Sequence, residues 1–392
     1  MKNNEIIDGT QRLLMANYGR APIAAVRASG AKLWDAAGNE YIDLFAGFGA
    51  AGLGHCHPAV VEAIRRQAGE MMCVGNLFHW ESQLELAEAI VRNSFPGRIF
   101  YCHSGAEANE AALKLARRAA GEGRYKIISF ENSFHGRTMG SLSLTGQTKF
   151  HASFEPMLPG CVYVPYGDLA AVEAAIDEQT AGIIVEPIQG EGGVHPPTVE
   201  FMQGLRRLCD QHKLTLICDE VWTAPARTGK WFAYQYYDIT PDVMTFGKAC
   251  GGGLPVAGCL ARSDKGLDEV LSPGTHGCTL GGNPVCAAAG AAVFKTIEDE
   301  GLVTIAGMRE GPIKYMIDNA KIPCIREVRG KGLMLGLQLE GDTSGVFQAC
   351  VEKGVLINVT ASKVLRVAPP LTITDDELGQ GLAAVLDTLR EM

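Results

Sequence analysis

Two short segments combine an apolar run with a side chain that can carry out covalent or acid–base chemistry. Lys248 directly follows the apolar run VMTFG and is separated from CGGG by one residue. Asp219 directly follows the apolar run LTLIC. A lysine in a tight, poorly hydrated turn has a lowered pKa and can act as an amine nucleophile. A carboxylate that ends a buried strand needs a cationic partner. We therefore expect Lys248 to bind a ligand covalently and Asp219 to pair with a protonated ring nitrogen of that ligand.

Two further segments offer places for a phosphate group and a flat ring. Ser104, Gly105 and Ala106 connect an apolar run to a helical pattern. The N–H groups at a helix start bind phosphate, and small residues let it approach. Phe134 and Arg137 lie in FHGRT, directly after the apolar run KIISF. The aromatic ring can stack on a flat ligand, and the guanidinium can pair with a carboxylate.

Each feature also has an ordinary structural explanation when it is taken alone. Ser104 can be a simple helix cap, Asp219 a cap or an ion-pair partner, and Lys248 a solvated loop residue. Arg137 can be an incidental surface arginine. The carboxyl ends of parallel strands, however, meet in one crevice. A phosphate cradle, a ring platform, an acid and a nucleophilic lysine together indicate pyridoxal 5'-phosphate, a cofactor that acts as an electron sink.

The elements that must position these residues follow from the hydrophobic pattern. Runs typical of strands cover 99–103, 126–130, 182–186, 215–219, 243–246 and 256–261. Helical spacing of apolar residues covers 107–119 and 200–212. Strands that alternate with helices favour a mostly parallel sheet with helices on both faces. The predicted fold class is therefore α/β.

The pattern changes after Pro284, where an alanine-rich helix runs to about Glu300 and mixed α and β signals follow. We predict a large cofactor-binding domain over 47–283 and a smaller α+β domain over 284–392. Residues 1–46 contain a hairpin pattern around Gly38 and Asn39 and are expected to pack on the small domain.

Composition limits the classes of function. The chain has 392 residues, 47% of them hydrophobic, and a net charge of 35 − 44 = −9. This charge is opposite to that of a protein that coats nucleic acid. Twelve cysteines without a C-x-x-C pair indicate buried thiols in a reducing cytoplasm. No apolar run reaches the ~18 residues of a membrane span, and no signal peptide is recognisable.

Three other motifs suggest different chemistry, but each lacks a required feature. Residues 47–52 match G-x-G-x-x-G, yet no helix pattern follows directly and no strand ends in an acidic residue about 20 positions later. We interpret them as a turn that allows close backbone approach. Residues 55–57 (His-Cys-His) cannot converge easily on one metal ion. Residues 251–253 lack the Lys-Ser/Thr ending of a P-loop. No metal site is predicted.

Several longer motifs make the sequence similar to the class III aminotransferases of pyridoxal-phosphate fold type I. The motifs are SGAEANEAALKLAR, FHGRT, EPIQGEGG, DEVWTAPARTG, FGKACGGGLP, HGCTLGGNP and RVAPPLTIT. They keep their order and spacing over nearly the whole chain. The resemblance implies a large domain with a sheet of the seven-stranded type, a smaller C-terminal domain, and pyridoxal 5'-phosphate as cofactor.

The resemblance also implies roles for single residues around the cofactor. Lys248 would hold its aldehyde covalently, and Asp219 would pair with its ring nitrogen. Val221 and Phe134 would pack on opposite faces of the ring. Thr279 of the partner subunit would reach the phosphate, which implies a homodimer. The implied cofactor-binding residues are Ser104, Gly105, Ala106, Phe134, His135, Glu186, Asp219, Val221, Trp222, Lys248 and Thr279.

The residues implied to bind substrates are Arg137, Glu191, Cys278 and Arg366. Arg137 would hold the substrate α-carboxylate. Glu191 would pair with Arg366 while the amino donor is bound and release it for the second carboxylate of 2-oxoglutarate. Within the family the sequence most resembles members that act on N2-acetylornithine. This implies transfer of its terminal amine to 2-oxoglutarate, giving N-acetylglutamate 5-semialdehyde and glutamate, as in arginine biosynthesis.

The sequence departs from the family pattern at several positions near the site. Trp222 stands where the family usually has Gln, and residues 224–226 (Ala-Pro-Ala) stand where it has glycines. Cys278 occupies a position often held by Ser. Other amino donors therefore stay open, namely ornithine, succinylornithine, 4-aminobutyrate or a lysine precursor, as does an aminomutase that needs no external keto acid. A catalytically silent pyridoxal-phosphate-binding regulatory protein is the alternative from a different class.

Overall fold

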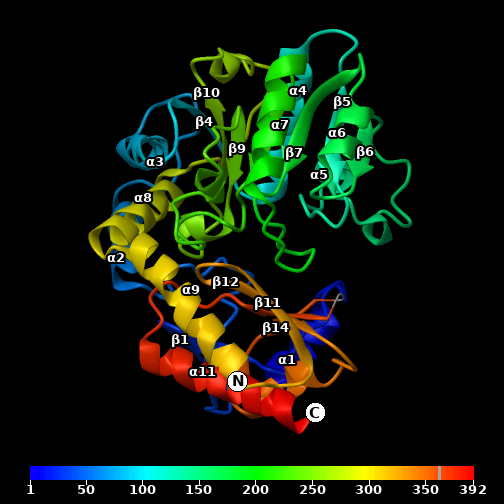
Figure 1. Cartoon of the computed structure of the whole chain (residues 1–392). Coiled ribbons are helices and arrows are strands. Elements are labelled where there is room, and N and C mark those ends of the chain that lie inside the picture. Colours follow the sequence, from blue (N-terminus) through cyan, green and yellow to red (C-terminus); the bar gives the residue numbers. More distant parts are fainter. Residues whose placement is uncertain (361–362) are drawn as a thin grey trace.

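The computed structural model describes residues 1–360 and 363–392, and its largest sheet has seven strands (Figure 1). Their order is β4 (Gly97–Cys102), β10 (Ala257–Arg262), β9 (Val243–Phe246), β8 (Thr215–Asp219), β7 (Thr180–Val185), β5 (Lys126–Phe130) and β6 (Cys161–Val164). Six strands point the same way, and β10 alone is antiparallel to its neighbours β4 and β9. The predicted α/β class with a mostly parallel sheet is confirmed.

Helices cover both faces of this sheet because neighbouring residues of each central strand point to opposite sides. Ile183 of β7 packs in an apolar core with α7 (Val199–His212), and Ile184 packs in another with α4 (Gly105–Ala120). Every residue of β7, β8 and β9 is buried. Such continuous apolar runs are typical of parallel strands that lie between two helical layers.

All six predicted strands are present, with ends that differ from the prediction by at most two residues. The helices predicted over 107–119 and 200–212 are α4 and α7. The seventh strand, β6, lies outside the predicted set. It forms the edge of the sheet, and it was missed although it is as long as β9 and all four of its residues are apolar.

Two four-stranded sheets form the other part of the molecule, drawn below the large sheet in Figure 1. One contains β1 (Ala25–Ser29), β2 (Lys32–Asp35), β3 (Glu40–Asp43) and β13 (Val355–Leu356); the other contains β11 (Ile325–Lys331), β12 (Met334–Leu339), β15 (Val364–Val367) and β14 (Asn358–Val359). The strands β2 and β3 form the expected antiparallel hairpin. Strand β3 pairs in parallel with β13, so the two ends of the chain share a sheet. The domain boundaries at 46 and 283 stay a prediction.

The remaining helices complete the layers. They are α1 (Asn3–Leu13), α2 (Pro58–Glu70), α3 (Glu81–Arg92), α5 (Met139–Leu144), α6 (Leu169–Ala175), α8 (Pro284–Asp299), α9 (Leu302–Asn319), α10 (Val346–Glu352) and α11 (Asp375–Glu391). Among the described residues, no helix is both long and apolar enough to span a bilayer.

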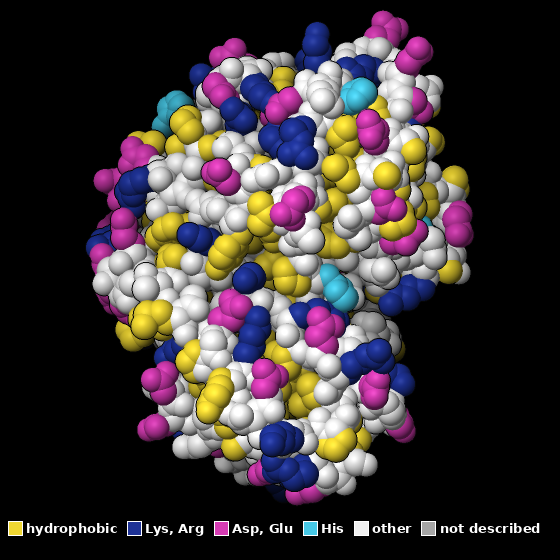
Figure 2. Space-filling model, in the orientation of Figure 1, with side chains coloured by type: hydrophobic (Ala, Val, Ile, Leu, Met, Phe, Trp, Pro, Cys, Tyr) yellow, Lys and Arg dark blue, Asp and Glu magenta, His cyan; other side chains and the backbone are white. Residues whose placement is uncertain are grey.

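Figure 2 shows basic and acidic side chains interspersed on one face of the molecule.

Candidate active site

A cavity of about 240 Å³ lies where the carboxyl ends of the central parallel strands meet. All four segments that the sequence pattern singled out contribute to its wall, because strands that run in the same direction end at the same edge of the sheet. The lining residues are Gly105, Ala106, Asn109, Phe134, His135, Gly136, Arg137, Glu186, Ile188, Glu191, Asp219, Val221, Trp222, Thr223 and Lys248.

The start of α4 forms one side of the cavity. Ser104 caps this helix: its Oγ accepts from the Glu107 N–H (3.3 Å), and Glu107 accepts from the Ser104 N–H (2.9 Å). The N–H groups of Gly105 and Ala106 have no intrahelical acceptor. A Cβ atom at Gly105 would lie 2.5 Å from Val221, so only glycine fits here. Ser104 itself is outside the set of lining residues, and its contact with a cofactor stays a prediction.

Asp219 lies at the end of β8 and is held by three donors. Its Oδ2 lies 2.7 Å from His135 Nδ1 and accepts from Asn109 Nδ2 at 2.7 Å, while its Oδ1 accepts from the Val221 N–H at 3.0 Å. Thr245 Oγ1 in turn donates to Asn109 Oδ1 at 2.8 Å. This arrangement keeps a buried carboxylate in one orientation.

Asn109 is a site residue that the sequence reasoning missed. It lies four residues after Gly105 in α4, so the two residues share one helix face. Asn109 lies on the buried side of α4 that packs on the sheet, where the apolar periodicity predicts no polar side chain. An amide-bearing residue one turn after Gly105 was the available signal.

Lys248 follows β9 and points into the same cavity. Its backbone has φ 46°, a left-handed conformation that is costly for a residue with a side chain and is typical of functional sites. Its Nζ lies 5.1 Å from the centre of the Trp222 ring. Burial lowers the pKa of Lys248, which favours the neutral, nucleophilic amine.

Glu186 and Glu220 are buried carboxyl groups with different positions. Glu186 lines the cavity and accepts from the N–H groups of Phe134 and Gly190, both at 3.1 Å. Glu220 turns away and accepts from Tyr234 N–H at 2.7 Å. Burial raises the pKa of each carboxyl to about 7. Glu186 thus connects the loop that carries Phe134 to the loop that leads to Glu191.

The two arginines implied in substrate binding occupy different surroundings. Arg137 is exposed at the cavity rim, with its guanidinium 4.1 Å from the Phe150 ring centre and 5.3 Å from that of Phe134. Arg366, on β15, is almost fully buried. Its Nη1 donates to Glu191 Oε1 at 2.7 Å. The structure therefore brings together the implied Glu191–Arg366 pair.

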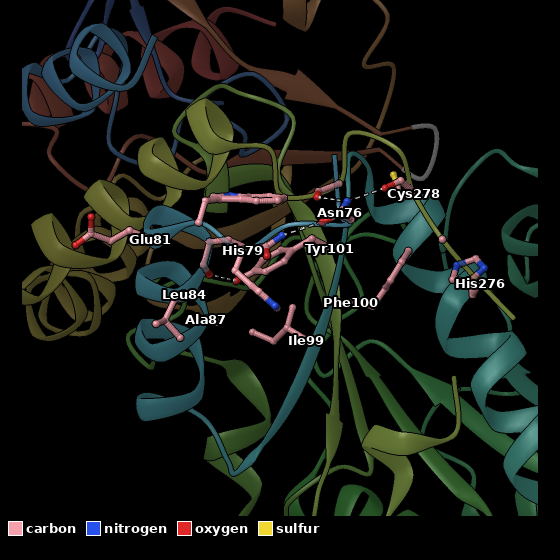
Figure 3. A pocket seen from close by; sticks show the side chains of 14 residues that line it. Asn76, His79, Glu81, Leu84, Ala87, Ile99, Phe100, Tyr101, His276 and Cys278 are labelled. Atoms are coloured by element: carbon pink, nitrogen blue, oxygen red, sulfur yellow. Dashed lines mark hydrogen bonds between the residues drawn. The ribbon is translucent and has the colours of Figure 1, made fainter. Parts of the chain in front are cut away.

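Cys278 and Thr279 lie apart from the other site residues in the single chain. Cys278 contributes to a separate cavity of about 830 Å³, shown in Figure 3, where its carbonyl accepts from Asn76 Nδ2 at 3.0 Å. Its Sγ lies 3.4 Å from His103 Nδ1. Thr279 is exposed. Both roles depend on a second chain and stay predictions.

The glycine-rich motif at residues 47–52 serves packing. Gly49 has φ 82°, and a Cβ atom there would overlap the Trp222 indole. This agrees with the interpretation of residues 47–52 as a turn that allows another part of the chain to approach the backbone closely. In the neighbouring His-Cys-His segment, His55 Nε2 lies 2.9 Å from Asp43 Oδ2.

The chemistry of the cavity fits pyridoxal 5'-phosphate. It contains free helix N–H groups for a phosphate, a fixed carboxylate for a ring nitrogen and a lysine for an aldehyde. Two buried ring nitrogens, His135 Nε2 and Trp222 Nε1, have no hydrogen-bond partner within the described part of the chain. The glycine at position 105 lets the start of α4 approach Val221 closely, and both residues line the cavity.

Known proteins share both the sequence and the fold. The family model "Aminotransferase class-III" matches residues 14–389. Acetylornithine aminotransferases of Caldanaerobacter subterraneus subsp. tengcongensis and Mycolicibacterium smegmatis are 43% and 45% identical, over 97% of this chain and 98% of theirs in both cases. The ornithine aminotransferase of Toxoplasma gondii, described with partial occupancy of pyridoxal phosphate, superposes with a TM-score of 0.95 at 31% identity, covering 99% of this chain and 94% of its own. The chain therefore belongs to the class-III aminotransferases, a family of pyridoxal-phosphate enzymes.

Proposed function

We propose that this enzyme transfers the terminal amine of N2-acetylornithine to 2-oxoglutarate. The similarity to enzymes named acetylornithine aminotransferase, over nearly the full length of both chains, supports this donor. The structural observation that carries the proposal is the ion pair between Glu191 and Arg366, at 2.7 Å, beside Lys248. One site must accept a donor with one carboxylate and a keto acid with two. A guanidinium that a mobile carboxylate can cover or release meets both demands.

When bound, pyridoxal 5'-phosphate supplies the electron sink that makes the substrate Cα–H or Cδ–H bond acidic. In this proposal Asp219 keeps a proton on the ring nitrogen, because its carboxylate is fixed by His135 and Asn109 and offers negative charge. The N–H groups of Gly105 and Ala106 bind the phosphate, and Phe134 and Val221 orient the ring.

Lys248 has two roles in the proposed reaction. Its Nζ would hold the aldehyde of the cofactor covalently until the substrate amine replaces it. The free Nζ would then accept the proton from the substrate carbon that bears the reacting nitrogen and pass it to the cofactor carbon on the other side of that nitrogen. Burial lowers the pKa of Lys248, which increases the fraction of the neutral amine that can accept a proton.

Arg137 and Arg366 provide the carboxylate sites. Arg137 lies at the rim with its guanidinium exposed, where it can hold the α-carboxylate of a donor whose reacting amine reaches Lys248. Arg366 stays paired with Glu191 during this half-reaction. In the second half-reaction Glu191 turns away and Arg366 binds the second carboxylate of 2-oxoglutarate.

We also propose that the enzyme is a cytoplasmic homodimer in which Thr279 of the partner subunit reaches the cofactor phosphate. Exposed apolar side chains before α3, those of Met72, Val74, Leu77 and Phe78, support an interface near Cys278. Sedimentation should give twice the chain mass. Thr279→Ala should weaken cofactor affinity about ten-fold, which corresponds to one hydrogen bond to a charged group. A monomeric holoenzyme with full activity would contradict the dimer.

The donor is tested by steady-state kinetics with 2-oxoglutarate and a panel of amines. We expect kcat/KM for N2-acetylornithine to exceed that for ornithine, succinylornithine and 4-aminobutyrate by about ten-fold or more, a difference that a few pocket contacts can supply. A higher value for ornithine would reassign the donor. Turnover without any keto acid would indicate an aminomutase. If no amino donor reacts with the holoenzyme in a single-turnover assay, the protein would be a catalytically silent binding protein.

A further inference from the structure

We propose that Trp222 is a positioning residue for Arg366: with Phe45 it holds the guanidinium in place while Glu191 is turned away, so that the second carboxylate of the keto acid meets a fixed cation. The inference rests on the proposed function, in which Arg366 serves the keto acid. It deepens that function because it assigns the residue that replaces the family's usual Gln.

The surroundings of Arg366 carry the proposal. Its guanidinium carbon lies 4.7 Å from the centre of the Trp222 ring and 5.2 Å from that of Phe45. Asn358 Oδ1 accepts from its Nε at 2.8 Å, and Glu191 is the carboxylate partner. Arg366 is 2% exposed. Three of these four neighbours are neutral, and Trp222 and Phe45 are buried in one apolar cluster, so their contacts do not depend on Glu191.

Departure of Glu191 creates a physical problem that the indole reduces. A buried guanidinium without a carboxylate is costly, and it would either move toward water or recruit another anion. An aromatic face attracts a cation, most strongly when both are removed from water, and tryptophan is the best ring for this. Trp222 therefore lowers the cost of the state in which Arg366 waits for the keto acid.

Trp222 is itself held in a fixed position. It is 7% exposed and packs in an apolar cluster with Phe45, Ile188 and Val194. Gly49 and Gly190 border the indole so closely that a Cβ atom at either position would overlap it. A rigid indole ring fixes the position of the Arg366 guanidinium. The smaller, flexible Gln side chain that the family usually has at position 222 would not fix it.

The same indole also lies near Lys248, with 5.1 Å between Nζ and the ring centre. Trp222 could therefore act only on Lys248, or only by shaping the cavity. These roles are separable, because they would affect the donor half-reaction, in which Arg366 keeps its partner Glu191. Positioning of Arg366 should affect only the binding of dicarboxylates.

The test uses the holoenzyme and glutarate, a dicarboxylate that can neither accept nor donate an amine. Calorimetric titration measures its Kd for the wild type, Trp222→Leu and Trp222→Phe. The matched control is Trp34→Leu, which removes another tryptophan–arginine contact, 3.7 Å from the Arg27 guanidinium to the ring and outside the cavity. We expect the Kd of glutarate to rise about ten-fold in Trp222→Leu, clearly less in Trp222→Phe, and not at all in Trp34→Leu.

Kinetics supply the second measurement. KM for 2-oxoglutarate should rise with the Kd of glutarate, and the loss in the 2-oxoglutarate half-reaction should clearly exceed any loss in the donor half-reaction, each measured in a single turnover. An unchanged glutarate Kd in Trp222→Leu, or an equal loss in the donor half-reaction, would overturn the proposal. If Trp222→Leu does not fold, Trp222→Gln is used with the same criteria. Failure of acetylornithine as donor would leave glutarate binding intact, so the two hypotheses fail separately.

Discussion

Asp219 Oδ2 and His135 Nδ1 lie 2.7 Å apart, with 4% and 0% of the two side chains exposed. His135 follows β5 and Asp219 ends β8, so two strand ends that are far apart in the sequence meet behind the cofactor cavity. The imidazole and the Asn109 amide both donate to one carboxylate oxygen. This fixes the negative charge that the proposed mechanism requires at the ring nitrogen.

Asp219→Asn should lower kcat about 10³-fold, because a neutral amide cannot hold the ring nitrogen in its protonated form. The fold should persist, since the side-chain volume is unchanged. Single-turnover kinetics and thermal unfolding check both points. Asp238→Asn is the control: Asp238 is exposed and has φ 52°, a conformation that Asn tolerates well. Equal losses in both variants would argue against the proposed role.

Lys248→Ala should reduce turnover by about 10⁴-fold or more, because both the covalent attachment and the proton transfer are lost. The visible absorbance of the covalently attached cofactor should disappear as well. Lys295→Ala removes an exposed lysine that is paired with Asp299 and should change neither property. Retained activity in Lys248→Ala would refute the mechanism.

Glu191→Gln should make Arg366 permanently available to dicarboxylates. With N2-acetylornithine and glutamate as alternative donors, we expect the ratio of their kcat/KM values to fall about ten-fold. The reason is that the second carboxylate of the substrate glutamate no longer competes with the Glu191 carboxylate for the Arg366 guanidinium. Steady-state kinetics with each donor measure the ratio. Glu327→Gln removes the exposed carboxylate that pairs with Arg329 and is the matched control. A ratio equal to that of the wild type would exclude the exchange of partners at Arg366.

Glu220 predicts a pH dependence of stability. Burial raises its pKa in the folded protein to about 7, from about 4.5 in the unfolded chain, so the folded state binds more protons between these values. The contribution of this carboxyl to the free energy of unfolding is fully present below pH ~4.5. It is lost as the pH rises through ~7, and the total loss is up to about 3 kcal/mol. Relative to the wild type, Glu220→Gln should therefore lose less stability between pH 5 and 8.

Urea unfolding of the holoenzyme at the two pH values measures this difference. Glu40→Gln, at an exposed position of β3 where the carboxylate pairs with Lys32, controls for removal of a carboxylate. Parallel pH profiles for the wild type and Glu220→Gln would show that the carboxyl titrates normally in the folded protein.

Much of the fold was predictable because its signals are local. The strands of the large sheet carry continuous apolar runs, and α4 and α7 carry clear helical spacing. No local sequence pattern indicated that β10 runs antiparallel to its neighbours, because its direction depends on how the chain turns after Lys248. Strand β6 was missed although it is as long as β9, so its length does not account for the omission.

The types of residue at strand ends and in the motifs predicted, without any structure, that Lys248 and Asp219 lie at one site, and the structure places both in one cavity, while their roles toward pyridoxal phosphate stay a prediction. Local chemistry sufficed for this because parallel strands bring their carboxyl ends together. Only the tertiary structure decided that Asn109 supports Asp219, that Asn358, Phe45 and Trp222 surround Arg366, and that Cys278 and Thr279 lie outside the cavity of their own chain. These relationships join segments from different strands and sheets, and the packing geometry that sets their distances leaves no periodic trace in the sequence.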